Sequence, residues 1–136
     1  QMIAAATRYW AVIFGLGFVL GAIRVMAVAP ALGEDRAVLI EVPLMLGASA
    51  WWARRVLRLH AVQRLGSAVV LGGIAFTELM LAELLLSRGL TGRSVEAWLD
   101  GMTRGPGLIG LAAQLGFGLM PALVLLARRG VCSSRC

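Results

Sequence analysis

Four long runs of mostly apolar residues fill this chain and limit its fold more than any other feature. They cover residues 9–32, 37–53, 65–86 and 106–127 approximately. A helix needs about 20 mostly apolar residues to cross the hydrocarbon core of a bilayer. Inside a bilayer, backbone polar groups must be satisfied within the segment, as they are in an α-helix. The runs therefore predict an all-α integral membrane protein, a four-helix bundle made of two transmembrane hairpins, with residues 1–136 as one domain.

A soluble helical bundle is the alternative, and it requires helices with a polar outer face. The stretch Ala11–Ile23 is apolar on all sides, which argues against such a face. The composition agrees, because only 15% of the residues are charged, against about 25% in typical soluble domains. A membrane location is therefore the prediction.

The arginines are distributed unevenly around the four runs and predict an orientation. Eight lie before the first run, between the second and third, and after the fourth, with no acidic residue among them. These are Arg8, Arg54, Arg55, Arg58, Arg64, Arg128, Arg129 and Arg135. The other two connections hold four arginines and four acidic residues. Positive charge collects on the cytoplasmic side, so we expect a multi-pass protein of the bacterial inner membrane with both termini cytoplasmic. Anionic headgroups are its expected lipid contacts.

Tryptophans lie where this orientation places the membrane surfaces. Trp10, Trp51 and Trp52 fall at the inner interface, which amphipathic rings prefer. On the outer side, Ser94–Asp100 lies within the one long connection and predicts a short interfacial helix between the third and fourth spans. Ser94 is a favourable N-cap, and Trp98 is expected to dip into lipid.

Five polar side chains fall inside the predicted spans, at least one in each. They are Arg24, Glu41, Glu78, Glu83 and Gln114. Counted along the helices from the outer turns at about 1.5 Å per residue, four of them share one level, with Glu83 slightly above it. A lone charge at that depth is unfavourable, so these groups should face inward and form a polar cluster.

Arg24 and Glu41 are equidistant from a tight turn, so we expect them to form an ion pair with two parallel hydrogen bonds. This pair could belong to a working site or only hold the first hairpin in register. Three carboxyl groups then share one guanidinium, so at least one of them is expected to carry a proton at neutral pH.

Glu78 is the deepest of the carboxyl groups and the preferred site residue, either binding a cation or carrying a proton. A structural role is the alternative, in which Glu78 is hydrogen-bonded to Gln114 or to a backbone carbonyl. Glu83 lies about 140° from Glu78 around the helix. We expect Glu83 to serve an interface or to extend outward toward Arg88.

Small residues predict close helix packing. Gly17 and Gly21 form a GxxxG motif, and Ala112 and Gly116 have the same spacing. Such faces let helices approach closely, within the bundle or between subunits. Pro43 and Pro121 lie inside the second and fourth runs and should each free a backbone carbonyl about four residues earlier.

The residue inventory contains no catalytic motif, so no enzyme activity, metal or cofactor is predicted. All thirteen basic residues are arginines, which excludes lysine chemistry. Cys132 and Cys136 lie on the terminal tail and supply fewer ligands than a metal site needs. The arginines flank the apolar runs instead of lining one face, so nucleic acid is not an expected partner.

Two functions fit these features. One is a small transporter or channel that moves a proton, a cation or a cationic solute past Glu78 in the intramembrane carboxylate cluster. The other is a non-catalytic accessory or assembly subunit of a larger membrane complex. Because four short helices bury little against one another, both lead us to expect a homo-oligomer or foreign subunits.

Three segments carry a family resemblance: Leu16–Arg24, Ile40–Leu46 and Ala82–Thr91. Together they resemble a group of small four-span bacterial inner-membrane proteins. That group has no assigned function, so the resemblance implies the topology and no activity.

Overall fold

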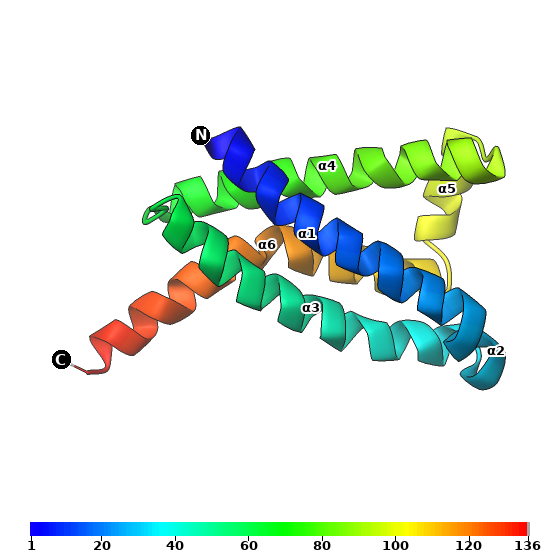
Figure 1. Cartoon of the computed structure of the whole chain (residues 1–136), viewed down its shortest axis with the longest axis horizontal. Coiled ribbons are helices and arrows are strands. Elements are labelled where there is room, and N and C mark those ends of the chain that lie inside the picture. Colours follow the sequence, from blue (N-terminus) through cyan, green and yellow to red (C-terminus); the bar gives the residue numbers. More distant parts are fainter. Residues whose placement is uncertain (136) are drawn as a thin grey trace.

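The computed structural model describes residues 1–135 and is helical almost throughout (Figure 1). Its elements are α1 (Met2–Ile23), the π-helical segment η1 (Arg24–Val28), α2 (Ala29–Leu32), α3 (Glu34–Leu59), α4 (Leu65–Thr91), α5 (Val95–Met102) and α6 (Pro106–Ser133). Residues 1–135 contain no strand. The expectation of an all-α protein is confirmed.

Three helical stretches are long and apolar enough to cross a membrane: Met2–Leu32, Leu65–Thr91 and Pro106–Ser133. This fits a membrane protein. The expected fourth span, 37–53, lies within α3 and does not meet the same criterion. Its apolar part is shorter, contains Glu41, and is enclosed by Arg36 and Arg54. The described residues thus contain three candidate spans, against the four expected.

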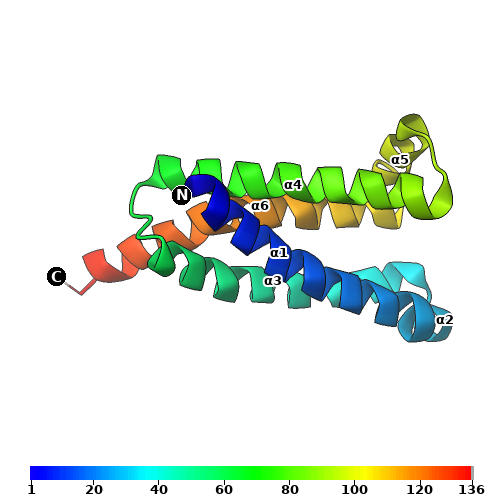
Figure 2. The ribbon, with the colours of Figure 1, turned by 45° about the horizontal axis from the view of Figure 1, so that its top comes forward.

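The long helices are arranged so that α1 and α6 each pack on both α3 and α4. Figures 1 and 2 show α1 crossing obliquely, with its start beside α4 and its end beside α3. The two chain ends lie at the same end of the molecule as the α3–α4 turn, and α2 and α5 lie at the opposite end (Figure 1). The two hairpins are thus α1–α3 and α4–α6.

The first long helix contains an irregularity that the apolar pattern does not reveal. Residues Arg24–Val28 form a π-helical turn, and α2 follows with Pro30 in its first turn. Gly33 ends the helix with φ +87°, a conformation that glycine adopts without strain. This geometry sets the direction from which Arg24 approaches α3.

The short helix between α4 and α6 is confirmed. It covers Val95–Met102, and Ser94 Oγ accepts a hydrogen bond from the Ala97 N–H at 3.2 Å. The predicted N-cap therefore has its expected role.

The α3–α4 turn begins with a Schellman motif. The Val62 N–H donates to Leu57 O and the Ala61 N–H to Arg58 O, which is the hydrogen-bond pair of that motif. Ala61 is in the left-handed region with φ 49°, where glycine is the usual residue. Val62 and Leu57 are both buried and close the turn.

The closest helix crossing lies at glycines other than those expected. A Cβ added to Gly72 would lie 1.8 Å from Gly118 O, so α4 and α6 approach backbone to backbone. Gly17 and Gly116 instead face the Met45 and Leu46 side chains of α3. Gly21 faces open space, and Ala112 is exposed.

Pro43 and Pro121 do not break their helices, because α3 and α6 run through them. Pro121 has no N–H to offer Phe117 O, as predicted. The Tyr9 hydroxyl donates to that carbonyl at 2.8 Å. The Tyr9 and Phe117 rings also stack, with centroids 4.6 Å apart. A freed backbone acceptor in α6 is therefore satisfied by α1.

Candidate functional site

A cleft of about 950 Å³ lies between the two hairpins. Its lining comes from α1, η1, α3, α4, α5 and α6, and from the connections flanking α5. The hairpins diverge toward the end that carries α2 and α5, as Figure 2 shows. The walls are largely apolar, with a small set of charged and amide side chains. These are Arg24, Glu34, Glu41, Glu83, Arg93, Arg104 and Gln114.

The inner limit of the cleft is the hydrophobic core. Ile13, Ser49 and Phe117 line the cleft and are themselves buried. Tyr9, fully buried behind them, fastens α1 to α6 through Phe117. Beyond this point the helices pack closely toward the end that carries the termini.

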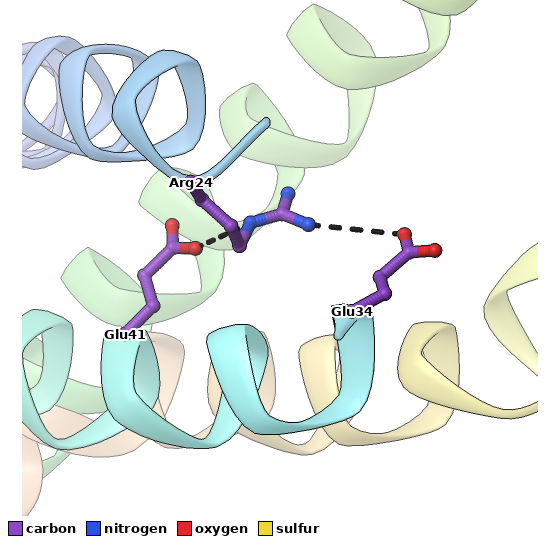
Figure 3. Close-up of polar contacts among 3 residues, drawn as sticks. All are labelled: Arg24, Glu34 and Glu41. Atoms are coloured by element: carbon purple, nitrogen blue, oxygen red, sulfur yellow. Dashed lines mark ion pairs between the residues drawn. The ribbon is translucent and has the colours of Figure 1, made fainter. Parts of the chain in front are cut away.

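Arg24 and Glu41 form the predicted ion pair, with Arg24 Nε 2.6 Å from Glu41 Oε2. The prediction that two parallel hydrogen bonds join these side chains is wrong. The Nε–H is not aligned for a hydrogen bond, and the guanidinium extends instead toward a second carboxylate. Arg24 Nη1 lies 3.9 Å from Glu34 Oε1 (Figure 3). One arginine thus bridges two glutamates of α3.

Glu83 and Gln114 form the second polar contact in the cleft. Gln114 Nε2 lies 2.7 Å from both Glu83 Oε1 and Oε2, so one amide group donates to the carboxylate. Within residues 1–135, Glu83 has no ion-pair partner. The expected orientation of Glu83 toward Arg88 is wrong, because its side chain bridges α4 to α6.

Glu78 does not line this cleft. Its Oε1 accepts a hydrogen bond from Thr7 Oγ1 at 2.6 Å, and its Oε2 is buried without a donor in the described part of the chain. The alternative bond from Gln114 to Glu78 is therefore also wrong. The predicted cluster of five divides into a cleft group of four and Glu78.

Glu78 lies apart from the cleft group because its position along α4 does not determine which neighbouring helix its side chain faces. The oblique crossing of α1 brings Thr7, in its second turn, against the middle of α4. Thr7 precedes the predicted first span, so counting from the apolar run omitted it. The helix-compatible Ala-rich start, Ala4–Thr7, was the signal available.

The cleft mouth carries residues that sequence reasoning placed in a connection. Arg104 Nη2 pairs with Asp100 Oδ1 at 2.9 Å, and both side chains are exposed. Arg93 and Trp98 also line the cleft. Trp98 was expected to dip into lipid, but it faces the cleft and is half-buried.

At the opposite end, aromatic and basic side chains contact one another. Trp52 Nε1 donates to Arg8 O at 3.1 Å, and Arg8 Nη1 lies 3.3 Å from His60 Nε2. The Arg55 guanidinium lies over the exposed Trp51 ring, 5.6 Å from its centroid. Trp10 stacks on Phe14.

The chain end has one tertiary contact and one free thiol in the described residues. Arg129 donates to Gln63 O, which ties α6 to the α3–α4 turn. Cys132 is an exposed free thiol, and Cys136 lies outside the described residues.

Comparison of the chain with protein-family models, with curated proteins and with solved structures finds no match.

Proposed function

We propose that this chain is a small carrier of the bacterial inner membrane, and that the cleft between its hairpins takes up a solute in exchange for, or together with, a proton. The observation that carries the proposal is the position of Glu83. Its carboxylate lies in the wall of a large cleft, half-buried, with only an amide as its polar partner in the described chain. A carboxylate within a span needs a proton or a cation to balance its charge. Glu83 is therefore the group that couples solute to proton.

The shape of the cleft supports a carrier more than an open pore. The lining of the cleft extends from η1 and α5 at one end to Phe117, which stacks on Tyr9, at the other. A carrier must open its site to one side at a time, and relative movement of two helical units is a common way to do so. The hairpins α1–α3 and α4–α6 are the two units available.

The proposed topology has four spans, with α3 as the fourth, and both termini in the cytoplasm. The end with both termini carries eight of the thirteen arginines, which favours the cytoplasmic side. It also places anionic headgroups beside those arginines. The cleft then opens outward.

Proton movement in proteoliposomes tests this function. Vesicles with a pH-sensitive dye inside receive a potassium diffusion potential, with sodium, amines, amino acids or sugars supplied in turn outside. We expect wild-type vesicles to change internal pH with at least one solute. Glu83→Gln should abolish the change, because it keeps the size and hydrogen-bonding capacity of the side chain but removes its titration.

Glu78→Gln is the matched control, because it makes the same change on the same helix outside the cleft. It should retain the proton movement. Wild-type vesicles that behave as empty vesicles with every solute would refute the carrier. Equal loss in both variants would refute the assignment to Glu83.

The accessory-subunit hypothesis predicts a different native complex. Mass analysis after extraction in a mild detergent should show copies of this chain alone for a carrier. Foreign subunits in fixed stoichiometry would overturn the proposal in favour of an accessory role.

A further inference from the structure

The polar part of the cleft wall has an unused hydrogen-bond acceptor. The Gln114 amide nitrogen faces the Glu83 carboxylate, which when ionised only accepts hydrogen bonds. This orientation leaves Gln114 Oε1 as an acceptor, and it is buried with no donor among residues 1–135. An unsatisfied buried carbonyl is unfavourable. The wall therefore presents two acceptor groups, Glu83 and Gln114 Oε1, to which a ligand can donate hydrogen bonds.

The charges of the cleft favour a positive ligand at this place. Arg24 already contacts Glu41 and Glu34, and Arg104 pairs with Asp100. Arg93 also lines the cleft without an ion-pair partner in the described chain, but its guanidinium lies beside Gly101 of α5 at the cleft mouth. Glu83 is the cleft carboxylate without an ion-pair partner in the described chain. A bound cation would balance the negative charge of the Glu83 carboxylate, whereas an anionic group would be repelled by it.

The rest of the wall selects against a bare metal ion. Hard cations such as calcium take six to eight oxygen ligands, and Glu83 and Gln114 together offer three side-chain oxygens. The surroundings are apolar, with Phe14 from α1, Met45 and Leu46 from α3, and Leu79 and Leu86 from α4. A cleft of about 950 Å³ has the size of sites that hold compact organic molecules.

We propose that the solute is an amphipathic amine. Its protonated primary or secondary nitrogen donates hydrogen bonds to the Glu83 carboxylate and to Gln114 Oε1. Its hydrocarbon body lies against the apolar side chains of α1, α3 and α4. This inference rests on the proposed use of the cleft as a solute site, and it adds the chemical class of the solute.

Equilibrium dialysis against protein in lipid nanodiscs tests the assignment, with empty nanodiscs subtracted. Three probes share one hydrocarbon cage: adamantylamine, its trimethylammonium analogue and adamantane carboxylate. The amine should bind at least about tenfold more tightly than the trimethylammonium analogue, because only the amine has N–H donors for the charged acceptor. The carboxylate should not bind above background.

Variants then locate the site. Glu83→Gln should weaken amine binding by at least about tenfold, since the charged partner is lost. Gln114→Leu should weaken it less and should reduce the preference for the amine over the trimethylammonium analogue. Glu78→Gln should bind the amine as tightly as the wild type does. This control would show that replacing a glutamate of α4 does not by itself weaken amine binding.

Equal affinity for amine and trimethylammonium analogue would overturn the donor requirement, and tighter binding of the carboxylate would overturn the charge assignment. Unchanged amine binding by Glu83→Gln would overturn the site. Proton movement with another solute, combined with no amine binding, would refute this inference and leave the carrier function standing. Amine binding without proton movement under any condition would refute the carrier instead.

Discussion

At the residue scale, the contact of Arg24 with two glutamates defines one side of the cleft. Glu41 is the near partner and is half-buried, whereas Glu34 is 68% exposed and farther away. The mutual attraction of two opposite charges is stronger where both are shielded from water. Glu41 should therefore contribute most of the stabilisation that Arg24 receives.

A double-mutant cycle measures this difference. The cycle of Arg24→Ala with Glu41→Ala should give a coupling free energy of about 1–3 kcal/mol, between the values for exposed and buried pairs. The cycle of Arg24→Ala with Glu34→Ala is the control and should give less than about 1 kcal/mol. Thermal unfolding in detergent is the measurement. Equal coupling in the two cycles would contradict the assignment of Glu41 as the principal partner.

Ala61 is the second residue whose conformation leads to a prediction. It occupies the left-handed position of the Schellman motif, where a Cβ is unfavourable by about 1–2 kcal/mol. Ala61→Gly should raise the unfolding temperature because it removes this unfavourable Cβ. The gain in stability should be at most about 1 kcal/mol, since glycine loses more conformational freedom on folding than alanine does. The control is Ala127→Gly on the exposed side of α6, which should lower stability. A loss with both variants would contradict the motif.

At the scale of elements, the α4–α6 crossing depends on Gly72. An added methyl group there would overlap Gly118 O, which belongs to the backbone and cannot move away alone. Gly72→Ala should destabilise the protein by about 3 kcal/mol or more, the upper range for overpacking.

The neighbouring Gly73 provides a matched control. A Cβ at Gly73 would meet nothing within 4 Å, so Gly73→Ala should be neutral or stabilising by about 0.5–1 kcal/mol. Chemical or thermal unfolding of the two variants separates contact from helix propensity. Similar losses would mean that the helices do not cross at Gly72.

The contact between α1 and α6 allows a rescue experiment. Tyr9→Phe removes the donor to Phe117 O and should be unfavourable by about 1–3 kcal/mol, because the carbonyl is buried and Pro121 leaves it without a helical partner. Pro121→Ala restores an N–H at that position. The loss caused by Tyr9→Phe should then shrink in the Pro121→Ala background, as measured by thermal unfolding. An unchanged loss would show that the hydroxyl acts elsewhere.

At the scale of the whole molecule, the proposed topology places α2 and α5 outside the cell. A variant with Cys132→Ser and Cys136→Ser provides a background for single engineered cysteines. Asp35→Cys, in the first turn of α3 and exposed, should react with a membrane-impermeant maleimide in intact cells. Ser134→Cys should react only after the cells are opened. The reverse pattern would invert the cleft.

The sequence predicted the helices well because each depends on a local pattern. Apolar length located the long helices, and Ser94 located α5 through a cap that acts within one turn. The Arg24–Glu41 pair was also predictable, because a short turn fixes the register of its two helices.

The rest of the candidate site depends on how helices distant in sequence cross. Glu78 and Glu83 lie on one helix. Their predicted separation around its axis agrees with the different neighbours that the two side chains contact. Which neighbours they meet depends on the slope of α1 across α4 and on the Gly72–Gly118 approach. Neither can be read from a single helix. The sequence therefore favoured Glu78 as the site residue, whereas the structure has Glu83 in the wall of the cleft.

The π-helical turn Arg24–Val28 affects where the gene could lose a single codon without disrupting the fold. Losing one codon inside an ordinary α-helix rotates everything beyond it by about 100°. A π turn is an α-helix with one residue inserted, so removal of Val25 would return this segment to α geometry. The residues on both sides, including α2 and the Gly33 turn, would keep their register with α3. Within the first long helix, this turn is the place where a single-codon deletion is compatible with the fold.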